Sequence, residues 1–294
     1  MWGILWYPYR LLAQAGGVGG ELAALLTYGM AALAGFVVFP RAAREWLTHP
    51  WLFFFMGVAA GISNVSYILS VIEGNIVRVV LLFNLAPLWT IPLARWLLNE
   101  KLSARGYAVM SIAMLGALVM LWRPDIGMPW PTSRADWLGV VAGLFFALSN
   151  VMVRKVEGAS FPAKSLAVLA GVTLVALPVA LAFTPYSALS SVPSQWPLLS
   201  GIALALICMS LVLQYGLSHV TATRAVVIML FELVVAAAAA WWLADEVARA
   251  QEWIGGALIV AASLLSGYMG QAPPRNNAAV RLNPAPKLSA NKRQ

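Results

Sequence analysis

A single carboxylate, Glu232, lies in an otherwise apolar stretch, MLFELVVAAAAAWW, at residues 229–242. An acid at the centre of a membrane-spanning helix costs about 2.5–3.5 kcal/mol on insertion scales, so it usually faces protein or water and marks a pathway. There it can hold the ammonium group of a solute or take up a proton. In a second interpretation, Glu232 is protonated or bonds to a neighbouring helix, and only holds the bundle together. The sequence is compatible with both.

Other polar and aromatic side chains lie inside apolar segments and can line a cavity with this acid. They are Trp6, Tyr7, Tyr9, Asn64, Tyr67, Asn84, Trp89, Asn150, Gln214 and Tyr215. Each one alone is also compatible with helix packing or with a place at the membrane interface. Together with Glu232, they suit a solute that has an amine and an apolar or aromatic body. We predict that these residues and Glu232 bind the substrate.

Three further residues are candidates for gating or hinge motion. Pro8 and Pro87 lie inside predicted helices, where proline bends the backbone and frees a carbonyl group. Arg78 begins a predicted helix at the membrane surface. Ordinary snorkelling explains it, and a gate-closing ion pair, for instance with Glu73, is the alternative.

Composition identifies the solvent around these residues. Of the 294 residues, 61% are hydrophobic and 10% are charged, and the mean hydropathy is +0.81. A typical soluble domain is about 25% charged, and this chain has too little polar surface to cover so much apolar surface. The net charge of +8 comes from scattered basic residues, so nucleic acid is not a predicted partner. The single cysteine excludes an intrachain disulfide, and we predict neither a metal site nor another cofactor.

The chain divides into apolar runs that are long enough to cross a bilayer as helices, the structure that satisfies the backbone in lipid. We place them near 1–15, 21–40, 51–72, 76–98, 105–122, 136–156, 164–183, 197–217, 222–243 and 252–270. The first run is short and contains Arg10. The tail, 271–294, is polar, Pro-rich and basic, and we expect it to be disordered.

The Lys and Arg residues predict the orientation. If the N-terminus lies in the cytoplasm, the inner loops and tail hold most of the basic residues, whereas the outer side holds only Arg78, Arg123, Arg134 and Arg249. This bias agrees with the positive-inside rule. We therefore predict an integral protein of a bacterial inner (plasma) membrane with both termini in the cytoplasm.

The two halves of the chain resemble each other. Arg78 and Glu100 in the first half match Arg224 and Glu246, 146 positions later. Chance similarity between apolar helices is the alternative, but shared charges at one offset favour duplication. Five spans per half make the second half inverted, an architecture of many secondary transporters.

The predicted fold is accordingly an all-α membrane protein with ten helices, arranged as two inverted five-helix repeats around a central cavity. The predicted parts are the first repeat at 1–122, a linker at 123–135, the second repeat at 136–270 and the tail at 271–294.

Three segments carry a resemblance to a known family: WGILWYPYRLL, LAPLWTIPLARWLLNEKLS and FELVVAAAAAWWLADEV. They resemble signatures of the first, fourth and ninth helices of the drug/metabolite transporter superfamily, in its EamA-type ten-helix branch. Leu233 departs from the pattern, because the ninth helix of the family usually has Pro there, and Asn99 and Asp245 replace the usual Gly before the paired glutamates. The aromatic-rich first helix is most similar to bacterial amino-acid exporters.

The resemblance implies a transporter, and the residues narrow its substrate. No Lys or Arg lies at mid-membrane in the third to tenth predicted spans, so a phosphate-bearing solute lacks a partner. We predict a secondary transporter that exports aromatic or bulky apolar amino acids and related amphipathic metabolites by alternating access. The alternative is efflux of lipophilic cations with proton exchange at Glu232. An enzyme is not predicted, because His49 and His219 lie near loop edges and no hydrolase motif accompanies them.

Overall fold

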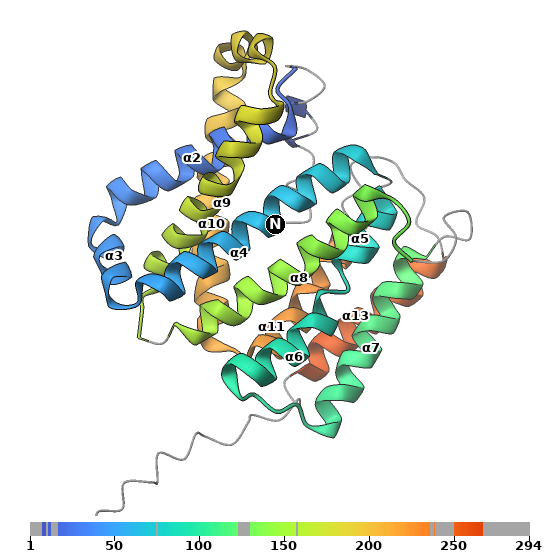
Figure 1. Cartoon of the computed structure of the whole chain (residues 1–294). Helices are drawn as coiled ribbons and strands as arrows, with labels where there is room; N and C mark the ends of the chain where they lie inside the picture. Colours follow the sequence, from blue (N-terminus) through green and yellow to red (C-terminus); the bar gives the residue numbers. More distant parts are fainter. Residues whose placement is uncertain are drawn as a thin grey trace, which may run out of the picture.

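The computed structural model describes residues 8–9, 11–12, 17–74, 76–122, 130–156, 158–235, 238 and 250–266. All regular elements within these ranges are helices (Figure 1). Trp6 and Tyr7, which we predict to bind substrate, lie outside the described residues, as do Arg10, Glu246 and the basic tail.

The longer helices follow the predicted spans. They are α2 (Gly20–Val38), α4 (Pro50–Glu73), α5 (Ile76–Phe83), α6 (Ala86–Leu98), α7 (Ala104–Leu121), α8 (Arg134–Lys155), α9 (Phe161–Phe183), α10 (Val192–His219), α11 (Ala222–Met229) and α13 (Ala250–Leu265). Short connecting helices are α3 (Pro40–Arg44), η1 (Glu45–Thr48) and η3 (Tyr186–Ser191). Within the part of the chain that the structure describes, seven stretches are long and apolar enough to cross a membrane, and they match the second to eighth predicted spans. The shorter α13 is also apolar and falls in the tenth.

Local chemistry explains where several helices begin. The side chains of Ser103, Ser133 and Ser160 accept hydrogen bonds from the backbone at the starts of α7, α8 and α9. At the start of α8, Asp136 completes a capping box with Ser133. These side chains satisfy backbone N–H groups that have no partner within the helix.

The end of α6 is shaped by Asn99, which adopts a left-handed conformation with φ 54°. Asparagine tolerates this conformation better than most residues other than glycine. This is the position where the related family usually has Gly. Because the chain reverses at Asn99, the next residue, Glu100, is directed back toward the helix bundle, where its backbone N–H donates to Ala94 at 3.2 Å.

The sixth span, α8, packs on the first half of the chain although it belongs to the second half in sequence. It lies along α4, α5 and α6 and makes only minor contact with α10 and α11 (Figure 1). A glycine explains the contact, because a Cβ atom on Gly143 would lie 2.6 Å from the carbonyl oxygen of Phe83. The two halves are therefore interleaved and do not form separate bundles.

A second backbone contact joins α4 to α9. A Cβ atom on Gly171 would lie 2.2 Å from the carbonyl oxygen of Gly57, and one on Gly61 would lie 2.6 Å from the carbonyl oxygen of Gly171. Small residues let membrane helices approach closely, which compensates for the absence of a hydrophobic driving force between helices in lipid.

The fourth and ninth spans are both interrupted, at corresponding positions. A turn at Asn84 and Leu85 separates α5 from α6, and a turn at Leu230 ends α11. The bounds of α5 and α11 are 146 positions apart at both ends. Pro87 lies within α6, as expected, but in its first turn, where a missing N–H costs nothing. The ninth span is interrupted although Leu233 replaces the usual Pro.

We expect a single methyl group at the α4–α9 contact to destabilise the protein. Gly171→Ala should lower the free energy of unfolding by about 1–3 kcal/mol, because backbone atoms cannot move aside as a flexible side chain can. Thermal unfolding of the purified protein in detergent measures this change.

Gly201→Ala in α10 is the matched control, since a Cβ atom there meets nothing within 4 Å. It should be neutral or stabilise by about 0.5–1 kcal/mol through reduced backbone entropy. Equal effects of the two substitutions would show that the α4–α9 contact is not close.

Candidate functional site

An acid and a row of aromatic rings form the centre of the candidate site. Tyr67 of α4 lies against Phe83 of α5 with ring centroids 4.9 Å apart, and Phe83 lies 5.2 Å from Phe146 of α8. The exposed Glu232 lies within electrostatic reach of the Tyr67 phenol. Tyr67 is half-buried among the helices, and Glu232 follows the turn at Leu230 that ends α11. The two predicted residues thus share one region.

Two separate hydrogen bonds connect α4 to α2, and α2 to the first span. Asn64 lies one turn before Tyr67 on α4, and its Oδ1 accepts a 2.8 Å bond from the Tyr28 hydroxyl of α2. The Tyr9 hydroxyl lies 2.7 Å from Oγ1 of the neighbouring Thr27. The predicted residues Tyr9 and Asn64 are therefore linked to the same helices as Tyr67. Asn64 also donates to the carbonyl oxygen of Ala60, so its amide has its own partners.

Asn150 of α8 approaches the ninth span from the other side. Its Nδ2 donates to the thioether sulfur of Met229 at 3.7 Å, one turn before Glu232. A thioether is a weak acceptor, so this amide can exchange Met229 for a stronger acceptor at little cost. Asn150 is the predicted residue whose donor is held least firmly.

Two predicted residues lie at the break in the fourth span. Asn84 is half-buried, and its Nδ2 donates to the carbonyl oxygen of Val80 at 2.8 Å. This bond occupies the side chain with its own helix end. Trp89 follows on α6 with 36% of its surface exposed. Both lie within six residues of Phe83, and neither forms a hydrogen bond or ring contact with Glu232 or Tyr67 among the described residues.

The predicted residues of α10 do not join this group. Tyr215 is 54% exposed and lies against Phe161 and His219, with centroid distances of 5.7 and 4.3 Å. It occupies the outer surface near the end of α10. Gln214 is 2% exposed, and its Oε1 has no hydrogen-bond partner among the described residues. Gln214 therefore belongs to the packed interior.

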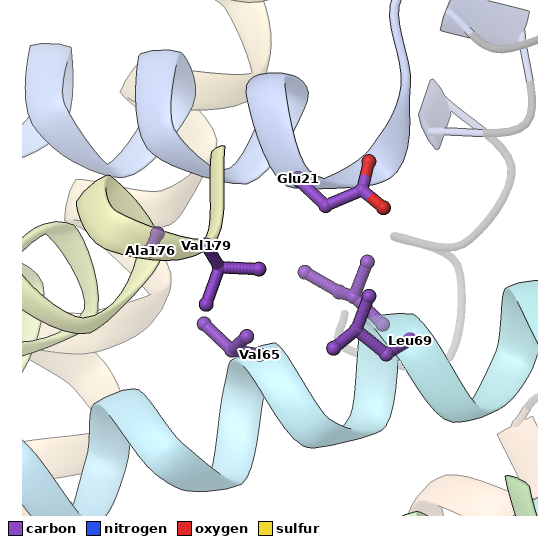
Figure 2. Close-up of a pocket in the computed structure, with 6 residues that line it drawn as sticks. Glu21, Val65, Leu69, Ala176 and Val179 are labelled. Atoms are coloured by element: carbon purple, nitrogen blue, oxygen red, sulfur yellow. The ribbon is translucent and has the colours of Figure 1, made fainter. Parts of the chain in front are cut away.

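A small pocket lies elsewhere, between α2, α4 and α9 (Figure 2). Its lining is apolar apart from Glu21 and comprises Val65, Ile68, Leu69, Ala176 and Val179. A volume of about 10 Å³ is room for a single water molecule. This pocket contains none of the predicted substrate-binding residues and is too small for an amino acid.

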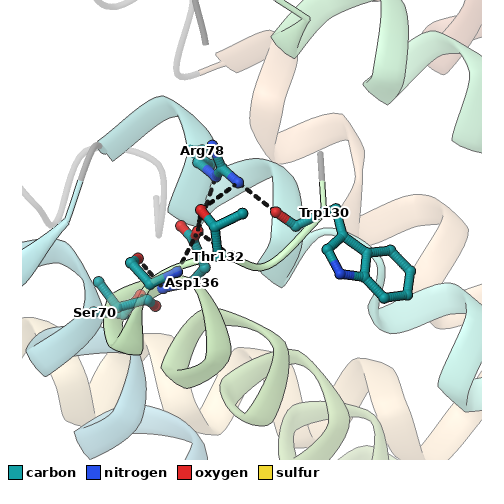
Figure 3. A network of polar contacts seen from close by, with 7 residues as sticks. Ser70, Arg78, Trp130, Thr132 and Asp136 are labelled. Atoms are coloured by element: carbon teal, nitrogen blue, oxygen red, sulfur yellow. Dashed lines mark hydrogen bonds and ion pairs between the residues drawn. The ribbon is translucent and has the colours of Figure 1, made fainter. Parts of the chain in front are cut away.

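Arg78 is held in a polar network at one end of the bundle (Figure 3). Its Nε lies 3.0 Å from the carboxylate of Asp136 in the first turn of α8, and its Nη2 donates to Thr132 at 3.0 Å and to the carbonyl oxygen of Trp130. The same carboxylate accepts the backbone N–H groups of Thr132 and Ser133. Arg78 thus pairs with Asp136, which sequence reasoning missed.

The suggested alternative partner of Arg78, Glu73, pairs instead with Arg134 at 3.7 Å on the exposed surface. Sequence alone could not separate these pairings, because Arg78 and Asp136 come together only when α5 packs beside α8.

A second ion pair lies near the opposite end of α8. Arg154 lies 3.8 Å from Glu100, which follows α6, and also donates to the carbonyl oxygen of Ser218 at 3.1 Å. Burial raises the pKa of the Glu100 carboxyl, although Arg154 and the backbone N–H of Ala222 partly offset this effect. The sequence repeat singled out Glu100, without placing it beside Arg154.

We expect the Arg78–Asp136 pair to stabilise the fold as one unit. Asp136→Ala removes both the ion pair and the capping box and should cost about 2–4 kcal/mol of unfolding free energy. The double variant with Arg78→Ala should lose less than the sum of the two single variants. Thermal unfolding in detergent gives the comparison.

Glu73→Ala is the control, since its pair with Arg134 is exposed and should contribute less than about 1 kcal/mol. Strictly additive losses for Arg78 and Asp136 would contradict the pairing.

Comparisons with known proteins bear on the second half directly. Residues 133–268 match the model of the EamA-like transporter family. A solved crystal structure has a similar fold, with a TM-score of 0.71 and 15% sequence identity over 90% of this chain and 94% of its own. No curated protein matches in sequence. The apolar helices and this match make the chain an integral membrane protein, and residues 133–268 are similar to the EamA-like transporter family, which consists of membrane transporters.

Proposed function

We propose that the chain is a secondary transporter that exports aromatic or bulky apolar amino acids, and related amphipathic metabolites, by alternating access. The single observation that carries this substrate class is that Glu232 lies within electrostatic reach of Tyr67, whose ring belongs to the aromatic row with Phe83 and Phe146. A carboxylate attracts an ammonium group, and aromatic faces accommodate both a cation and an apolar body.

Asn150 is the proposed partner for the substrate carboxylate. Among the described residues around Glu232, its Nδ2 donor is held by a thioether alone. A carboxylate accepts stronger hydrogen bonds than a thioether sulfur. Substrate can therefore displace Met229, so that Glu232 takes the amine and Asn150 takes the acid.

The proposed architecture has ten helices in two inverted repeats, with the substrate between them. The matching bounds of α5 and α11, and the interruptions that follow both, support a duplication. Interrupted helices at corresponding positions are typical of transporter binding sites. The placement of both termini in the cytoplasm of a bacterial cell stays a prediction from the basic residues.

Pro8, Arg78 and Pro87 remain our candidates for gating or hinge motion. The position of Pro87 directly after the break between α5 and α6 supports such a role, since element ends absorb backbone rotation during domain movement.

Counterflow of labelled phenylalanine in proteoliposomes tests the proposal. Uptake should exceed that of empty vesicles, and Glu232→Gln should reduce it at least about tenfold, because the substrate ammonium loses its charge partner. Tyr67→Ala should raise the concentration for half-maximal uptake more than Tyr67→Phe, which keeps the aromatic face.

Tyr215→Ala is the matched control, since this tyrosine lies on the outer surface. Absence of counterflow for every amino acid tested, with the protein intact, would refute amino-acid export.

Efflux of lipophilic cations in exchange for protons is the second candidate. It is favoured by the same acid and rings, because a quaternary amine needs no partner for a carboxylate. Asn150→Ala separates the candidates. An amino-acid carrier should lose about 1–3 kcal/mol of substrate-binding free energy, because the substrate carboxylate loses its hydrogen-bond donor. Dye-cation efflux should be unchanged. Equilibrium binding of phenylalanine and of a dye cation to the purified variant measures both.

A further inference from the structure

Two side chains grip the turn between α10 and α11 from one side. Arg154, at the end of α8, donates through Nη1 to the carbonyl oxygen of Ser218 at 3.1 Å. Glu100, directly after α6, accepts the backbone N–H of Ala222. The pair itself is loose, with 3.8 Å between the Arg154 Nη2 and the Glu100 Oε1. Its stronger contacts are with the turn.

Each charge matches the helix end that it contacts. Ser218 lies in the last turn of α10, where unpaired carbonyl groups concentrate negative charge, and it faces the cation. Ala222 begins α11, where unpaired N–H groups concentrate positive charge, and it faces the anion. Charges placed this way stabilise helix ends. Lys164 of α9 adds a 3.2 Å bond to the Ser218 hydroxyl.

The two gripping residues lie at the end of α8 and directly after α6, and the turn that they contact joins α10 to α11. Because α8 packs along α4, α5 and α6, Arg154 and Glu100 are carried by neighbouring helices. Contacts of α8 with α10 and α11 are minor by comparison. Ala94, Val151 and Ala222, all fully buried, form a small apolar cluster there, and Leu217 and Ala225 pack with Met152 and Val153 in a larger one. The polar grip adds to these apolar contacts at the turn itself.

We propose that Glu100 and Arg154 form a clamp on the α10–α11 turn that closes the predicted cytoplasmic end of the carrier and must open for loading from that side. The proposal rests on the transport function and the orientation proposed above. The contacts of the clamp are incomplete, which allows it to open. Glu100 Oε2 and Arg154 Nε have no hydrogen-bond partner among the described residues, and the side chains of Glu100 and Arg154 are 14% and 28% exposed. A partly hydrated, incompletely bonded pair separates more readily than a fully bonded buried one.

Accessibility of a cysteine beneath the clamp tests the proposal without any substrate. Asn150 lies one turn before Arg154 on α8, is 4% exposed, and contacts Met229 of α11. Asn150→Cys in a Cys208→Ser background gives one thiol that is reached only when α11 moves away from α8. A membrane-impermeant maleimide is applied to right-side-out and to inside-out vesicles.

Glu100→Ala and Arg154→Ala should each speed labelling about three- to tenfold from the predicted cytoplasmic side and leave labelling from the other side unchanged or slower. Glu73→Ala, which removes an acid from an ion pair at the opposite end of α8, should leave the rate unchanged. Unchanged labelling in both clamp variants would overturn the proposal.

A charge exchange separates the clamp from a simple ion pair. In the double variant Glu100→Arg, Arg154→Glu, a simple pair would re-form and labelling would return to the slow rate. The clamp predicts fast labelling, because the new Arg faces N–H groups of α11 and the new Glu faces carbonyl groups of α10. Slow labelling in this variant would overturn the proposal.

Glu100→Gln is the control for misfolding. It keeps an acceptor for the Ala222 N–H without the charge, so the protein should remain monodisperse and show an intermediate labelling rate. If labelling responds as predicted while no amino acid shows counterflow, the substrate proposal fails and the clamp stands. If counterflow occurs and labelling does not respond, the clamp fails alone.

Discussion

The close approach of helix backbones at glycine is the contact on which the rest of this structure depends. In lipid, apolar side chains gain little by leaving a solvent that is equally apolar, so helices associate through tight packing and polar contacts. Gly143 brings α8 against α5, and Gly57 and Gly171 bring α4 against α9. Because α8 is drawn onto α4, α5 and α6, the halves of the chain interleave. The packing of α8 on the first half of the chain places Phe146 beside Phe83 and Arg154 beside Glu100.

The interrupted spans add the polar chemistry that continuous helices would lack. A helix that ends inside the bundle leaves backbone groups and short turns at a depth where lipid-exposed backbone is not tolerated. The turn at Asn84 and Leu85 lies next to Phe83, and the turn at Leu230 lies two residues before Glu232. The aromatic row and the acid are thus both set beside breaks. This arrangement links the fold to the proposed site through geometry as well as through residue type.

The two ion pairs of α8 differ in a way that follows from their surroundings. Arg78 and Asp136 have several partners, with Asp136 accepting backbone N–H groups and Arg78 donating to Thr132, and Asp136 is 3% exposed. Glu100 and Arg154 are more exposed and keep unsatisfied atoms. Full bonding favours a permanent joint, and incomplete bonding favours exchange. One end of α8 is therefore fixed to α5, while the other end holds a neighbouring turn more weakly.

The sequence by itself determined the class of the protein and most of its helices, because the need for about 20 apolar residues per span leaves little freedom in lipid. It also determined that the second to eighth spans form apolar helices, and that Glu232 and Tyr67 are candidates for one site. Asn99 is an example of a feature that local sequence predicts, since its left-handed conformation agrees with the Gly usually found at this position in the family that the sequence resembles. These features depend on neighbours within a few residues or on composition.

Only the tertiary structure decided which distant residues meet. Phe83 and Phe146 are apolar residues within apolar segments, and nothing in the sequence around them indicates that their rings meet. Asp136 and Glu100 carry charge, but their partners lie on other helices. Tyr215 and Gln214 are adjacent in sequence, yet one lies on the surface and the other in the interior. Neighbouring residues of a helix point in different directions. Which of them contact another helix depends on which face is turned toward that helix, and this is decided by packing.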